Sequence, residues 1–286
     1  MGFNEGGYRG GQKKSWGDKT SSRFGQSRSA PRGPSRDAPD RDDGMQVIYG
    51  IHSVGEALKN PRRRLHRLIA TENGAFRLAE ELRAHDLAMP IEAVLVPADD
   101  ITRQLTADAV HQGVLLLAEP LTPIEVEDIG DNALVLALDQ ITDPHNVGAI
   151  LRSAAAFGVD AVIITERHSP SVTGVLAKAA SGALEHVPFA FAKNLGNALE
   201  DLRKRGFLTL GLDSDAEHDL ADTPIHRPVC IVLGAEGKGM RQRTRDIVEH
   251  MVRLEMPGAI RSLNVSNAAA ITLYAVTQAI AKKAPQ

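Results

Sequence analysis

Three segments of the sequence combine polar residues with small ones, and each borders an apolar run. The first is 139–153, DQITDPHNVGAILRS, in which Asp143 can cap a helix and Pro144 suits its first turn. Asn146 and Arg152 lie off the apolar stripe of that helix. An arginine so placed can bind a phosphate or stabilise the charge that develops on a reacting hydroxyl. Taken alone, the segment favours a structural cap followed by a surface arginine.

The second segment, GAEGKGM at 234–240, directly follows the apolar run 229–233. Its glycines permit positive φ angles and a close backbone approach to a ligand, with Glu236 held in the turn. A phosphate-binding loop is the obvious rival, but Lys238 is followed by glycine rather than by serine or threonine. A dinucleotide-binding loop would follow the first strand of its domain, whereas this one comes late.

The third segment, RSLNVSNAAA at 261–270, opens the last helical pattern of the chain. Small residues at a helix start allow the backbone and the hydroxyl of Ser262 to approach a neighbour closely. A capped and tightly packed helix is the alternative interpretation.

The elements around these segments alternate between strands and helices. Strands are expected at 134–139, 161–165, 187–191, 207–212, 229–233 and 251–254, and helices at 147–157, 172–183, 195–204 and 265–282. Continuous apolar strands that alternate with helices indicate a mostly parallel sheet covered on both faces. In such sheets the site lies beyond the carboxyl ends of the strands, where the first two polar segments begin.

A smaller α/β domain is expected before this one, at 45–118. Its strands are predicted at 46–49, 65–70, 91–96 and 114–118, and its helices at 54–59 and 75–85. The proline-rich and acidic segment 119–131 predicts a linker, so the second domain spans 132–286. A basic run at 62–67, RRRLHR, could face phosphates or form a solvated loop.

Residues 1–44 are rich in Gly, Ser, Arg and Pro and have no apolar periodicity, which predicts a disordered tail. The tail carries a net charge of +3, although the whole chain carries −3. Tyr8, Trp16 and Phe24 alternate with arginines, a pattern suited to stacking on unpaired RNA bases. A solubilising tail is the alternative.

Composition favours a soluble, cytoplasmic protein. The chain has no apolar run long enough to span a membrane and no secretory h-region, so no membrane association is expected. Its one cysteine, Cys230, lies in an apolar run and is expected in the core, which leaves no disulfide framework. The ten histidines include no metal-binding H-E-x-x-H pair, and no bound metal is expected.

In this order, the three polar segments resemble motifs one, two and three of the SpoU/TrmH class of RNA 2′-O-ribose methyltransferases. The stretch from VIYGIHSVGEAL to HQGVLLLA resembles the L30-like RNA-binding domain found in the bacterial large-subunit rRNA guanosine methyltransferases of this class. The resemblance covers about 46–283. It implies a C-terminal α/β knot, S-adenosyl-L-methionine as cofactor, and a homodimer whose sites include residues of both subunits.

The resemblance also implies roles for individual residues. The catalytic set would be Asn146, Arg152, Glu236, Ser262 and Asn264, and the cofactor would contact Gly234, Leu254, Met256 and Leu263. Because arginine stays protonated, electrostatic stabilisation is the role expected of Arg152. The chain departs from the class at Glu255 and Asn267, and neither change removes a catalytic group.

The expected reaction is therefore methylation of a ribose 2′-hydroxyl, with a guanosine of 23S rRNA as the favoured target. A tRNA ribose methyltransferase and a non-catalytic RNA-binding ribosome assembly factor are the alternatives. The five catalytic residues argue against the non-catalytic factor, and the L30-like segment favours rRNA over tRNA.

Overall fold

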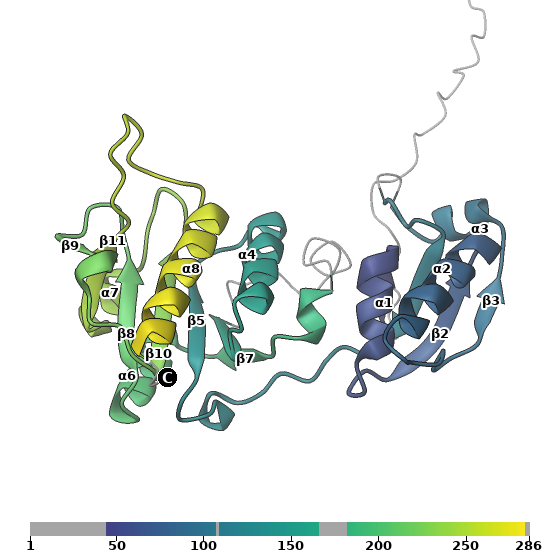
Figure 1. The fold of residues 1–286 in the computed structure, drawn as a ribbon, viewed down its shortest axis with the longest axis horizontal. Helices are drawn as coiled ribbons and strands as arrows, with labels where there is room; N and C mark the ends of the chain where they lie inside the picture. Colours follow the sequence, from purple (N-terminus) through teal and green to yellow (C-terminus); the bar gives the residue numbers. More distant parts are fainter. Residues whose placement is uncertain (1–43, 107–108, 166–181, 284–286) are drawn as a thin grey trace, which may run out of the picture. The chain divides into compact units, whose positions relative to one another are not determined.

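The computed structural model describes residues 44–106, 109–165 and 182–283, drawn in colour in Figure 1. The described residues all belong to one compact unit. The expected tail, apart from its last residue, and nearly all of the expected helix at 172–183 lie outside the described residues. Among the helices that are described, none combines the length and the apolar character needed to cross a membrane.

The N-terminal part of the unit is built on a four-stranded sheet with the order β1-β4-β2-β3. Its elements in chain order are β1 (Gln46–Tyr49), α1 (Ile51–Lys59), β2 (Leu65–Ala70), α2 (Glu72–Arg83), β3 (Ala93–Leu95), α3 (Ala98–Thr102) and β4 (Val114–Ala118). Thr71 caps α2 by accepting a hydrogen bond from the Gly74 amide at 3.1 Å. Leu78 and Leu82 then pack from α2 into the core beneath the sheet. The sequence did not predict α3, since it is short and only Ile101 is buried.

The C-terminal part contains a seven-stranded sheet with the order β7-β6-β5-β10-β8-β11-β9. Its elements in chain order are β5 (Leu134–Asp139), α4 (Pro144–Ala156), β6 (Ala161–Thr165), η2 (Ala183–Glu185), β7 (Phe189–Ala192), α6 (Leu195–Lys204), β8 (Leu208–Leu212), β9 (His218–Asp219), η3 (Leu220–Asp222), β10 (Val229–Gly234), α7 (Gln242–Ile247), β11 (His250–Arg253) and α8 (Val265–Lys283). All of its strand pairs are parallel.

Both faces of this sheet are covered by apolar packing. Along β5, Leu134, Leu136 and Leu138 belong to one core cluster, which also holds residues of α4 and α8. Val135 and Ala137 point the other way and belong to a second cluster with residues of α6. Because side chains alternate along a strand, an apolar residue at every position requires both faces to be buried. The expected mostly parallel, doubly covered sheet is confirmed.

Cys230 is fully buried on β10, as its apolar surroundings predicted. Burial raises the pKa of its thiol above the ordinary value because the thiolate would lose its hydration. The residue is therefore a packing element of the sheet and not a reactive nucleophile.

The predicted linker at 119–131 is partly packed onto the second sheet. The Ile124 amide donates to the Phe189 carbonyl at 2.8 Å, and a 3-10 helix, η1 (Val126–Asp128), follows. Val126 and Ile129 are buried in the same cluster as Val135. The second half of the segment thus has apolar anchors that its acidic composition obscures.

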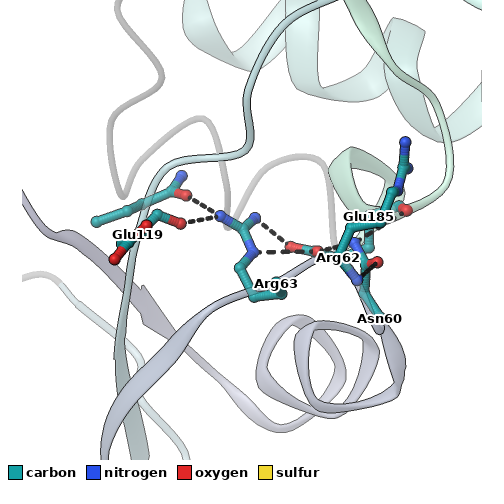
Figure 2. Close-up of polar contacts among 6 residues, drawn as sticks. Asn60, Arg62, Arg63, Glu119 and Glu185 are labelled. Atoms are coloured by element: carbon teal, nitrogen blue, oxygen red, sulfur yellow. Dashed lines mark hydrogen bonds and ion pairs between the residues drawn. The ribbon is translucent and has the colours of Figure 1, made fainter.

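The basic run at 62–67 does not form a uniform phosphate-facing surface, because Arg63 points inward. Figure 2 shows its guanidinium between Glu185 on one side and Glu119 on the other. Arg63 Nε donates to Glu185 Oε2 at 3.2 Å, and Nη2 forms an ion pair with Glu185 Oε1. Nη1 donates at 2.8 Å both to Gln46 Oε1 and to the Glu119 carbonyl. Asn60 also donates to Glu185 Oε2, at 2.7 Å.

The other members of the run are at the surface. Arg64 and His66 lie 3.6 Å and 3.1 Å from carboxylate oxygens of Glu119. Arg62 and Arg67 are exposed and remain available to solvent or to a phosphate. The run therefore divides between a structural arginine, paired cations and exposed cations, a division that its sequence did not predict.

Candidate active site

A cavity of about 450 Å³ lies at the carboxyl ends of β8 and β10. The segment that follows β11 and the first turn of α8 complete its walls. Cavities of this size accommodate small-molecule ligands. All four predicted cofactor residues line it, together with two of the predicted catalytic set: Gly234, Leu254, Met256, Leu263, Glu236 and Ser262. The structure thus brings together residues that are up to 29 positions apart, from Gly234 to Leu263.

The glycine-rich segment after β10 forms a tight turn. Ala235 and Gly239 exchange two backbone hydrogen bonds, of 3.2 Å and 2.8 Å. Gly237 and Gly239 have φ angles of 75° and 65°, which favour glycine. At Gly234 the reason for glycine is space, since a Cβ there would lie 2.3 Å from the Gly239 carbonyl carbon and 2.4 Å from the Met240 nitrogen. The turn therefore folds back against the end of its own strand.

Replacing Gly234 by alanine is expected to damage the cavity. Both clashing atoms belong to the backbone, so the turn must move, and such overpacking costs about 1–3 kcal/mol. We expect a lower melting temperature and a cofactor affinity reduced by at least about tenfold. Gly130→Ala is the matched control, because a Cβ at Gly130 meets nothing within 4 Å. Calorimetry and thermal melting of both variants measure the effect, and a Gly234→Ala protein with unchanged binding would contradict it.

A hydrogen-bonded cluster joins the three polar segments. Asn264 Nδ2 donates to Glu236 Oε1 at 2.6 Å and to Asn146 Oδ1 at 3.1 Å. The Val265 amide also donates to Glu236 Oε1, at 3.0 Å. One carboxylate oxygen therefore orients the Asn264 amide and accepts from the first residue of α8, where the helix dipole favours a negative charge. Asn146, from α4, is held in the same cluster.

Asn264 has a second function at the start of α8. Its Oδ1 accepts from the Ser266 amide at 2.9 Å and from the Ser266 hydroxyl at 2.5 Å. This is the geometry of a helix cap, which the sequence offered as the alternative for this segment. Capping and membership of the polar cluster coexist here, since they use opposite ends of the same amide.

Arg152 is not part of this cluster within a single chain. Asn146 and Arg152 are six residues apart on α4, which places their side chains about 120° apart around the helix axis. Arg152 is exposed and borders a shallow surface depression with Ala149, Ser153 and Phe157. Among the described residues, no hydrogen bond or ion pair links Arg152 to Asn146, Glu236 or Asn264.

The sequence did not predict the polar residues that follow β8. Asp213, Ser214 and Asp215 line the same cavity as Gly234, where they lie with Arg245 from α7. They belong to no glycine-rich motif, although Asp213 to Asp215 directly follow the apolar strand 207–212. A polar run at the carboxyl end of a parallel strand is the signal that would have identified them.

Asp139, the last residue of β5, contacts the residue that follows the glycine-rich segment. Asp139 is fully buried, and its Oδ2 accepts a hydrogen bond from the Arg241 amide at 2.8 Å. The guanidinium of Arg241 lies 3.6 Å from Asp139 Oδ1. Asp139 thus ties the residue after the glycine-rich turn to the neighbouring strand.

Comparison with known proteins matches both parts of the chain to one family. The model of the SpoU rRNA methylase family matches residues 133–274, and the model described as RNA 2′-O ribose methyltransferase substrate binding matches 47–124. A 23S rRNA (guanosine-2′-O-)-methyltransferase from Vibrio vulnificus is 35% identical over 254 residues, which cover 83% of this chain and 99% of that protein.

Solved structures show the same fold. A TrmH-family protein from Porphyromonas gingivalis is 27% identical, with a TM-score of 0.66 and coverage of 82% of this chain and 89% of that one. The SpoU methyltransferase AviRb from Streptomyces viridochromogenes, solved with AdoMet, is 22% identical, with a TM-score of 0.68 and coverage of 82% and 90%. These likenesses confirm the expected fold class.

Proposed function

The chain belongs to the SpoU rRNA methylase family, and from this membership we propose that it transfers a methyl group from S-adenosyl-L-methionine to a ribose 2′-hydroxyl of RNA. The observation that carries the proposal is the cavity of about 450 Å³, because it gathers all the predicted cofactor residues beside the Asn146–Glu236–Asn264 cluster. A guanosine of 23S rRNA is the proposed target, supported by the name of the Vibrio vulnificus relative.

The cavity fits the proposed cofactor in size and in chemistry. A Cβ at Gly234 would clash with the backbone of the glycine-rich turn, so this position has to be glycine. The end of β10 therefore offers backbone atoms, and no side chain, to a ligand at this position. Leu254, Met256 and Leu263 offer apolar contact, and other parts of the lining, such as Asp213 and Glu236, are polar. When bound, S-adenosyl-L-methionine supplies an electrophilic methyl group on a positively charged sulfur. Gly234, Leu254, Met256 and Leu263 would hold it.

The polar residues would act on the ribose. A ribose hydroxyl is a weak nucleophile near neutral pH and needs an oriented acceptor or a stabilised developing charge. Asn264 donates to both Glu236 and Asn146, which orients the three side chains. Glu236 and Ser262 line the cavity. We assign these four residues to positioning the ribose, and Arg152 to stabilising the charge on the 2′-oxygen or binding the adjacent phosphate.

Within one chain Arg152 borders a different depression from the cavity, so we propose a homodimer through the α4–α8 face that brings it to the cavity of a second copy. Ile271 and Tyr274 on α8 are large apolar residues with 47% and 56% exposure. Tyr274 packs edge-on against Phe157, which borders the same depression as Arg152. An exposed apolar patch beside a functional cation is typical of a protein interface. The interface would bring Arg152 of the partner subunit to each cavity.

A charge placed in this patch is expected to dissociate the dimer. Tyr274→Glu would bury an unpaired carboxylate in the proposed interface, a substitution that strongly opposes association. We expect a monomer by light scattering and a loss of methyl transfer, with cofactor binding retained. Phe76→Glu is the control, because Phe76 is 64% exposed on α2, outside this face. A dimeric and active Tyr274→Glu protein would exclude the interface.

We further propose that 45–118 binds the RNA substrate, that 119–131 links it to the catalytic domain at 132–286, and that the basic segment 1–44 adds contacts to RNA. Exposed Arg62 and Arg67 are candidate phosphate contacts. Action on rRNA would place the enzyme in the cytoplasm.

The function is tested by incubating the purified protein with labelled S-adenosyl-L-methionine and either unmodified 23S rRNA or total tRNA. Mapping by mass spectrometry should show one 2′-O-methylguanosine in the rRNA and none in the tRNA. Methylation of tRNA alone would select the tRNA enzyme. Tight RNA binding without any transfer would select the non-catalytic assembly factor.

A further inference from the structure

Resting on the proposed cofactor, we infer that Asp213 recognises the ribose diol of S-adenosyl-L-methionine and that Arg245 positions it for this task. The pair lines the cavity but belongs to none of the three sequence motifs. Asp213 directly follows β8, which is hydrogen-bonded to β10, the strand that ends at Gly234. The carboxylate therefore stands beside the glycine-rich turn at the same edge of the sheet.

The side chain of Asp213 is held in place on both oxygens. Oδ1 accepts from the Asp215 amide at 2.9 Å, and Oδ2 forms an ion pair with Arg245 Nη1. The side chain is only 13% exposed, whereas that of Arg245 is 35% exposed. An ionised carboxylate has about four acceptor positions, of which these contacts occupy two. Two acceptor positions, one on each oxygen, remain for a ligand.

The glycine-rich turn leaves room for a ligand next to this carboxylate. A Cβ built on Gly239 would meet only Asp213 Oδ2, at 4.0 Å. Glycine at position 239 thus adds no side chain of its own beside the carboxylate.

A vicinal diol matches these remaining acceptors better than the other polar ends of the cofactor do. It presents two neighbouring O–H donors, and a carboxylate can accept one on each oxygen. The methionine ammonium is a cation, and the charge of Asp213 is already balanced by Arg245, which lines the same cavity. Recognition of a neutral diol needs acceptors rather than net charge, and an arginine-paired carboxylate supplies them.

The experiment compares S-adenosylhomocysteine with two related ligands, one without the ribose diol and one without the amino-acid end. Calorimetry measures the binding of S-adenosylhomocysteine, of its 2′,3′-dideoxy analogue, and of 5′-methylthioadenosine, which lacks the amino-acid end. Each is measured with the wild-type protein and with Asp213→Asn. Hydrogen bonds to a charged group predict that Asp213→Asn weakens S-adenosylhomocysteine about 10- to 100-fold. The same loss is expected for 5′-methylthioadenosine, and less than about twofold for the dideoxy analogue.

Two further variants control for structural effects. Asp222→Asn changes an exposed carboxylate that does not line the cavity and should alter binding by less than about twofold. Arg245→Gln removes the positioning cation and should reproduce part of the loss, again only for ligands that carry the diol. Melting temperatures of the free proteins show whether each variant is folded.

The possible outcomes separate this inference from the proposed function. A loss that disappears with 5′-methylthioadenosine and persists with the dideoxy analogue would place Asp213 at the ammonium and overturn the inference. An equal loss for all three ligands would reveal a distorted cavity and overturn it too. If the wild-type protein bound none of the three ligands, the proposed function would fail, and the inference with it. Wild-type binding with no effect of Asp213→Asn would reject the inference alone.

Discussion

Arg152→Ala is expected to slow methyl transfer about 100- to 1,000-fold, which is the usual effect of removing one group that stabilises a developing oxyanion. Cofactor affinity should stay within about twofold, because the proposed contact is made with the RNA and strengthens as the oxygen becomes charged. Lysine should rescue only part of the rate, since one ammonium cannot reproduce the planar fork of a guanidinium. Single-turnover transfer to rRNA measures the rate.

The control for Arg152 is another surface arginine. Arg243 is 56% exposed in its side chain and contacts Asn197 and Glu200, away from the cavity residues. Arg243→Ala should transfer methyl groups at close to the normal rate. A folded Arg152→Ala protein with near-normal transfer would end the assignment of Arg152. A lowered melting temperature together with lost activity would indicate a packing role instead.

Mixing two inactive variants tests whether Arg152 acts on the partner's cavity. Arg152→Ala retains an intact cavity, while Asn264→Ala retains Arg152. In a mixed dimer, the cavity of the first chain would receive Arg152 of the partner subunit, so one of the two sites would be complete. We expect the mixture to regain activity after subunit exchange, up to that of one working site per mixed dimer. No recovery in dimers shown to have exchanged would mean that Arg152 acts within its own chain.

The second large effect is expected at the buried ion pair of Arg63 and Glu185, whose side chains are 1% and 4% exposed. Removing one partner of such a pair leaves an unpaired charge and costs about 3–5 kcal/mol. Arg63→Met should therefore lower the urea midpoint and the melting temperature markedly. Arg62→Met is the matched control, because the neighbouring Arg62 is exposed and its change should cost less than about 0.5 kcal/mol.

The double variant Arg63→Met/Glu185→Leu separates the charge from the packing. If the unpaired carboxylate causes the loss, the double variant should be more stable than Arg63→Met alone. Asn60 would also lose its acceptor on Glu185, so full recovery is not expected. If the double variant were less stable than Arg63→Met alone and than Glu185→Leu alone, the pair would contribute mainly through the packing of its side chains.

Hydrophobic periodicity determined most of the secondary structure. The strands at 134–139 and 161–165 and the helix at 195–204 were predicted at the residues where they begin and end in the structure. Long apolar runs and helical apolar stripes can be recognised in the sequence, because an element that buries one or both faces needs apolar residues at a fixed spacing. Elements without such a signal were missed, including α7, of which only Thr244 and Ile247 are buried, and the two-residue strand β9.

The order of the three motifs also identified the family and its candidate residues from the sequence alone. A sequence contains the order of the motifs and their residue types, but it does not contain the distances between the motifs in space. Only the tertiary structure decided that Asn264 bonds to both Glu236 and Asn146, and that Arg152 is exposed and borders a different depression of the surface.

The same limit explains the residues whose surroundings the sequence did not indicate. Within RRRLHR nothing distinguishes Arg63 from its neighbours, because its partner Glu185 is 122 positions away. Asp213 likewise meets Arg245 across 32 positions. A charged residue is predicted to be solvated unless a partner is known, and partners so distant are brought together only by the packing of the sheets and helices between them.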